Sequence, residues 1–89
     1  MKTAKEMFKK LGYDYHFMDE ENFIYTKDYS IYDLCIAFDK KYKCYSLYKM
    51  LRELPAIGIE PFGFVDMELN KAINKQVEEL GWGEKENEN

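Results

Sequence analysis

Histidine and cysteine, two residue types that often act in catalysis or bind metals, are scarce in this sequence. Its 89 residues include one histidine and two cysteines. A catalytic His16 would need a nucleophile or an acid as a partner, and the sequence pattern supplies neither. Cys35 lacks a helix N-terminus or a cation that would lower its pKa, and one histidine with two cysteines lacks the spacing of a zinc site. No phosphate-binding loop is present. We therefore predict no catalytic residue, no metal, no cofactor and no enzymatic activity.

Other absences bear on location and partners. The sequence has no signal peptide and no apolar run of membrane length, so we expect a cytoplasmic protein of a bacterial cell that does not bind membranes. Cys35 and Cys44 are then expected to be reduced thiols. No stripe of basic residues exists and the net charge is −4, which disfavours direct binding of nucleic acid.

Aromatic residues, in contrast, are abundant: eight Tyr, six Phe and one Trp. Many of them alternate with polar residues between positions 30 and 51, a pattern typical of a β-hairpin. With a turn at residues 39–42, Phe38 would face Lys43, Ile36 would face Tyr45 and Leu34 would face Leu47. A slip of two residues would leave the faces of the hairpin unchanged.

The two faces of this hairpin differ in character. The predicted core face carries Tyr32, Leu34, Ile36, Phe38, Tyr45 and Leu47. The other face is smaller and mixed, with Tyr48 and Met50 as its bulky members. We expect the first face to meet the helices and the second to be open to solvent or to a partner.

Helix signals stand at both ends of the chain. Thr3 and Glu6 fit a capping box that opens a helix over residues 3–11, and Asp66 fits the N-cap of a helix over residues 67–80. Both helices end with Leu-Gly-aromatic, at Gly12 and Gly81, where glycine accepts the left-handed conformation of a C-terminal cap.

Short alternating segments lie between the helices. Residues 13–18 and 23–27 predict a first hairpin, and residues 57–65 predict an edge strand or an extended loop. The predicted fold is therefore α+β: an antiparallel meander of four to five strands, packed on one face by an N-terminal and a C-terminal α-helix. We expect one domain over residues 1–82 and an acidic flexible tail over residues 83–89.

Candidate binding residues fall into two groups. The aromatic and methionine side chains in excess of what a small core needs could form a protein-binding surface, where such residues are enriched. The acidic group could steer the protein toward a basic surface. The predicted partner-binding residues are Tyr25, Tyr29, Tyr48, Met50, Asp19, Glu20 and Glu21.

Three segments carry a resemblance to a group of small proteins from phages and prophages of Gram-positive bacteria. They are MKTAKEMFKKLGY at 1–13, IAFDKKYKC at 36–44 and KAINKQVEELGW at 71–82. The resemblance implies an accessory protein of a mobile element, and such proteins often resemble inhibitors of host defence. It carries over no catalytic residue.

Together these observations predict a non-enzymatic, protein-binding phage protein. We expect an inhibitor of a bacterial defence system, such as an anti-CRISPR protein that occludes an RNA-guided nuclease or another host enzyme. Two alternatives remain open: an acidic mimic of nucleic acid that inhibits a DNA-binding protein, and an oligomeric phage accessory or regulatory protein. The open sheet face or an edge strand could also pair two copies as a homodimer.

Overall fold

The computed structural model describes residues 2–51, 59–61 and 64–82, with the backbone alone for 59–61. Two helices, α1 (Ala4–Lys10) and α2 (Met67–Leu80), enclose five strands in the sequence. The strands are β1 (Asp14–Phe17), β2 (Asn22–Asp28), β3 (Tyr32–Asp39), β4 (Cys44–Leu51) and β5 (Ile59–Pro61). They form one antiparallel sheet in the order β1-β2-β3-β4-β5, so neighbours in sequence are neighbours in space.

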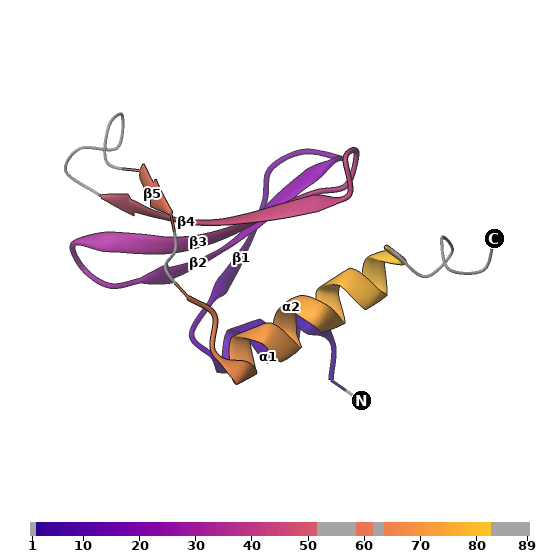
Figure 1. Ribbon diagram of the computed structural model, residues 1–89, viewed down its shortest axis with the longest axis horizontal. Coiled ribbons are helices and arrows are strands. Elements are labelled where there is room, and N and C mark those ends of the chain that lie inside the picture. The colour runs from indigo at the N-terminus through magenta and orange to yellow at the C-terminus, as the bar shows by residue number, and fades with distance from the viewer. Residues whose placement is uncertain (1, 52–58, 62–63, 83–89) are drawn as a thin grey trace.

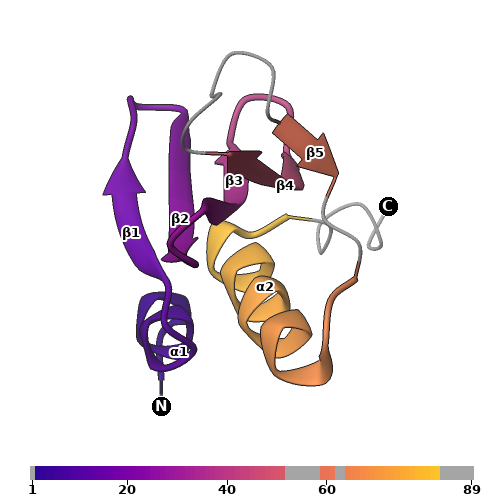
Figure 2. The ribbon, with the colours of Figure 1, turned by 90° about the vertical axis from the view of Figure 1, so that its left-hand side faces the viewer.

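Both helices lie on the same face of this sheet (Figures 1 and 2). The predicted α+β fold, an antiparallel meander covered on one face by the two terminal helices, is therefore confirmed. In the described part of the chain, no helix is long and apolar enough to cross a membrane. Within the predicted segment 57–65, Ile59–Pro61 form the edge strand β5, which pairs with β4. Residues 57–58 and 62–63 and the predicted acidic tail lie outside the described residues.

The caps that the sequence predicts fix the ends of both helices. Thr3 Oγ1 accepts from the Glu6 amide at 3.2 Å, and the Glu6 carboxylate accepts from the Thr3 amide at 2.8 Å. Asp66 accepts from the Leu69 amide at 2.8 Å. Gly12 and Gly81 have φ of +97° and +75° and end the helical segments in the left-handed region.

The hairpin of β3 and β4 keeps its predicted faces but pairs two residues further along. Phe38 pairs with Tyr45 and Ile36 pairs with Leu47, so the predicted pairing of Phe38 with Lys43 is wrong. Lys43 has φ of +53°, which an extended strand cannot accept, and it therefore belongs to the turn. The Asp39 carboxylate stabilises this shifted turn by accepting from two backbone amides within it, at 2.9 and 3.1 Å.

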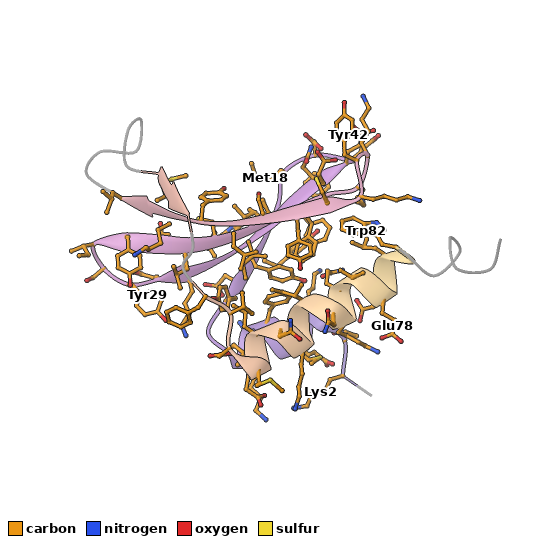
Figure 3. All side chains as sticks on the ribbon, viewed as in Figure 1. Lys2, Met18, Tyr29, Tyr42, Glu78 and Trp82 are labelled. Atoms are coloured by element: carbon orange, nitrogen blue, oxygen red, sulfur yellow. The ribbon has the colours of Figure 1, made fainter. Side chains whose placement is uncertain are left out.

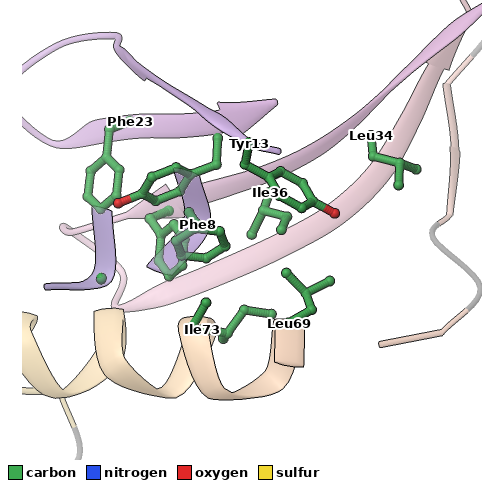
Figure 4. Close-up of a cluster of buried hydrophobic side chains, with 11 residues drawn as sticks. Phe8, Tyr13, Phe23, Leu34, Ile36, Leu69 and Ile73 are labelled. Carbon is green, nitrogen blue, oxygen red and sulfur yellow. The ribbon is translucent and has the colours of Figure 1, made fainter. Parts of the chain in front are cut away.

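The core lies between the sheet and the helices (Figure 4). Leu34, Ile36 and Phe38 are buried as predicted, whereas Leu47 is half-buried and Tyr45 is 42% exposed. The ring of Phe8 in α1 stacks on the ring of Tyr25 in β2, and the two ring centroids are 3.9 Å apart. The other buried members of the cluster are Ala4, Tyr13, Phe23, Leu69, Ala72 and Ile73.

Candidate functional site

The predicted partner-binding residues do not form one surface. Tyr48 and Met50 lie on the helix-free face of the sheet, since they alternate along β4 with Leu47 and Lys49, and Leu47 packs against the core. Tyr29 lies at the opposite end of the sheet from the turn that contains Tyr42 (Figure 3). The acidic group lies in the turn between β1 and β2, and Tyr25 lies in the core.

Tyr25 was predicted as a surface anchor, and this prediction is wrong. Its side chain is 1% exposed. The hydroxyl donates to Gln76 Oε1 of α2 at 2.6 Å, and burial raises the pKa of Tyr25. The physical reason is the pairing of Tyr25 with Ile36, which places the ring on the core face of the sheet.

The helix-free face consists of the side chains of β1 to β4 that point away from α1 and α2. Its central row contains Thr26, Cys35 and Tyr48, which are neighbours across three strands. Cys35 is only 2% exposed although neither described helix covers this face. Tyr48 and Met50 are half-buried, and Ser46 is exposed. The face is therefore a packed, mixed surface of aromatic, apolar and small polar residues.

The direction of the pKa shifts at this face argues against a reactive Cys35 thiol. Burial raises the pKa of the Cys35 thiol, with a further contribution from the charge of Asp33. Burial also raises the pKa of Tyr48 beside it. Since the thiolate is the reactive form of cysteine, a raised pKa keeps Cys35 in its unreactive protonated form at neutral pH.

The acidic turn has a structural role that the sequence did not reveal. Asp19 Oδ1 accepts from the Glu21 amide at 2.8 Å and from the Asn22 side chain at 3.1 Å. These hydrogen bonds lower the pKa of Asp19, the amide of Glu21 being the main cause. The Lys40 amide donates to the Glu21 carbonyl at 2.7 Å, which places the lysine-rich turn between β3 and β4 beside the acidic one.

His16 lies on the exposed edge strand β1. Its Nε2 is 2.9 Å from Thr26 Oγ1 on the neighbouring strand. Within residues 2–51, 59–61 and 64–82, no three His, Cys, Asp or Glu side chains are grouped closely enough to hold a metal ion. His16 thus has the setting of an ordinary cross-strand contact.

A cavity of about 320 Å³ opens where the N-terminal end of α2 meets the sheet. The sequence does not predict this cavity, because its walls come from segments far apart in the chain. Apolar side chains at its wall include Leu11, Leu34 and Leu69. We call it the tyrosine–lysine cavity after the tyrosines and lysines of its lining, which are Tyr13, Lys27, Tyr29, Tyr32 and Lys49. The lining also contains one carboxylate, that of Asp66.

Aromatic rings hold both lysines of the cavity. Lys27 Nζ lies 5.6 Å from the ring centroid of Tyr13 and 5.3 Å from that of Tyr29. Lys49 Nζ lies 5.1 Å from the centroid of Tyr32, which stacks on Tyr29 at 5.2 Å. Burial raises the pKa of Tyr13 to about 12, so its hydroxyl is a neutral donor at physiological pH.

Comparison of the chain with protein-family models, with curated proteins and with solved structures found no match. The resemblance to phage proteins therefore stays a prediction, and the function has to be inferred from the surfaces of the molecule.

Proposed function

We propose that this chain is a non-enzymatic protein-binding module of phage origin, which inhibits a bacterial defence enzyme such as an RNA-guided nuclease by occlusion. Its contact surface is the helix-free face of the sheet. The observation that carries this proposal is the position of α1 and α2, which both lie against the other face (Figures 1 and 2).

The composition of the helix-free face suits a protein partner. Tyr48 and Met50 provide large contact area, and Met adapts its shape to irregular surfaces. Ile24 and Ala37 add half-buried apolar surface in the neighbouring strands, and Ser46 is an exposed polar neighbour of Ala37. A rigid sheet with few flexible side chains loses little conformational entropy on binding.

The arrangement of charge favours occlusion over mimicry of nucleic acid. A mimic needs a continuous acidic surface, whereas the turn with Glu20 and Glu21 lies beside the turn that carries Lys40 and Lys41. Electrostatic steering by Glu20 and Glu21 is still part of the proposal, as a contribution to the association rate.

The test is affinity capture of tagged protein from a Gram-positive host, followed by mass spectrometry and an activity assay of the captured enzyme. We expect the tagged protein to capture one host enzyme in stoichiometric amount, and the activity of that enzyme to fall when this protein is added. Two results would contradict it: capture of no host protein, or capture of a second copy of this chain alone. The second result would favour the oligomeric accessory protein.

A further inference from the structure

We propose that the tyrosine–lysine cavity binds a small carboxylate that has a flat apolar body. The site lies on the helix-covered side of the sheet and is separate from the helix-free face. Binding of such a ligand would be independent of the proposed binding of a protein partner.

The size and lining of the cavity indicate a small-molecule site. Its volume of about 320 Å³ falls within the range of ligand pockets, which are mostly apolar with a few placed polar groups. Leu11, Leu34 and Leu69 supply apolar wall, and the stacked rings of Tyr29 and Tyr32 supply a flat one. A flat apolar ligand would replace water along these walls.

Charge selects an anion for this cavity. The lining contains two ammonium groups, on Lys27 and Lys49, and one carboxylate, on Asp66. Asp66 also accepts from the Leu69 amide as the N-cap of α2. The two ammonium groups outnumber this one carboxylate, so the lining has a net formal charge of +1. An ammonium beside the carboxylate of a ligand forms a charge-assisted hydrogen bond.

Lys27 is held in place before any ligand arrives. Its Nζ lies close to the rings of Tyr13 and Tyr29. Its Cε lies 3.0 Å from the position that a Cβ would take at Gly12, so the lysine stem packs closely over this glycine and would have to shift if a side chain stood there. A cation confined in this way loses little entropy when it binds an anion.

The aromatic faces in the cavity already have cations above them, which argues against a cationic ligand. An added ammonium group would have to displace Lys27 from Tyr13 and Tyr29, or Lys49 from Tyr32. It would also meet two like charges in a partly enclosed space. Both effects favour an anion over a cation.

The experiment uses naphthoate as the probe and naphthamide as its uncharged analogue, in low-salt buffer without phosphate. Binding is followed by NMR correlation spectra of the backbone amides of the full chain. We expect naphthoate to shift the amides of Lys27, Tyr29, Tyr32 and Leu69, and to bind about five-fold or more tightly than naphthamide. Equal binding of the two probes, or shifts confined to residues elsewhere, would overturn the proposal.

Two lysine variants make the test specific. Lys27→Met keeps the length of the stem and should weaken naphthoate binding about five-fold or more. Lys41→Met is the matched control, because Lys41 also lies over a tyrosine ring, 5.4 Å from the centroid of Tyr42, but does not line the cavity. Lys49→Met serves as the second variant if Lys27→Met fails to fold. Equal affinity of the cavity variant and the control would refute the site.

Discussion

The hydroxyl of Tyr25 donates to Gln76 Oε1 at 2.6 Å and so joins the second strand to the last helix inside the core. Gln76 is 7% exposed and is the one buried polar side chain among the described residues. The pair fixes how α2 lies against the sheet, because an unpaired polar group here would be cut off from water.

This hydrogen bond predicts an asymmetric response to mutation. Tyr25→Phe leaves the Gln76 carbonyl oxygen without its partner and should lower the free energy of unfolding by about 1–2 kcal/mol. The double variant Tyr25→Phe with Gln76→Leu should recover part of the loss, because both polar groups are then absent. Urea denaturation measures these changes. A neutral effect of Tyr25→Phe would contradict the role given to the pair.

In the central hairpin, the loss of unfolding free energy on truncation to alanine should increase with the burial of the side chain. Ile36 is fully buried, so Ile36→Ala should cost about 2–4 kcal/mol. Leu47→Ala should cost less, since Leu47 is half-buried. Tyr42→Ala is the control at 70% exposure and should stay within about 0.5 kcal/mol. Thermal or urea unfolding ranks the stability of the three variants. A larger loss of stability for Leu47→Ala than for Ile36→Ala would show that this assignment of the core is wrong.

The two left-handed glycines should differ in their response to alanine. Both Gly12→Ala and Gly81→Ala should cost about 1–2 kcal/mol for the strained backbone. Gly12→Ala should cost more, because its Cβ would meet Lys27 Cε at 3.0 Å, whereas nothing lies within 4 Å at Gly81. Equal losses of unfolding free energy in the two variants would show that Lys27 does not pack on Gly12.

Buried tyrosines predict a loss of stability at alkaline pH. Tyr13 titrates at about 12 in the folded protein and at about 10 in the unfolded chain, so the unfolded chain releases its proton first. The stability that this residue contributes is complete below pH of about 10 and is lost as pH rises toward about 12. Urea midpoints measured from neutral to alkaline pH test this. Tyr13→Phe should reduce the slope, and an unchanged slope would contradict the assignment.

The acidic turn should affect the association rate more than the dissociation rate. Glu20→Gln with Glu21→Gln should slow association with a captured partner and reduce its salt dependence, while dissociation stays nearly unchanged. Asp19 is left intact because it stabilises the turn. Surface plasmon resonance at two salt concentrations separates the rates. Complete loss of binding would favour the nucleic-acid mimic instead.

Local signals in the sequence were sufficient for the helices and the faces of the central hairpin. The caps at Thr3, Asp66 and Gly81 act through backbone groups a few residues away, so a short stretch specifies each helix end. Side-chain alternation likewise assigns a face without fixing the register. The register itself depended on the left-handed backbone of Lys43 and on the Asp39 carboxylate, which no alternation pattern encodes.

Long-range contacts account for what the sequence did not predict. The burial of Tyr25 depends on its pairing with Ile36 and on Gln76, which lies 51 residues away in the chain. The tyrosine–lysine cavity combines residues from Leu11 to Leu69, and its lysines are placed by rings on other segments. Composition indicates surplus aromatic residues but cannot show which of them meet.

The most direct test of the proposed function compares two arginine variants of neighbouring residues on β4. Ser46 is exposed on the helix-free face and Tyr45 is exposed on the opposite face, so each arginine adds bulk and charge to one face only. Inhibition of the captured host enzyme is measured for Ser46→Arg and Tyr45→Arg, with circular dichroism to verify folding. We expect Ser46→Arg to abolish inhibition and Tyr45→Arg to retain it. Retained inhibition by Ser46→Arg, or its loss in Tyr45→Arg alone, would contradict the claim that the helix-free face binds the partner.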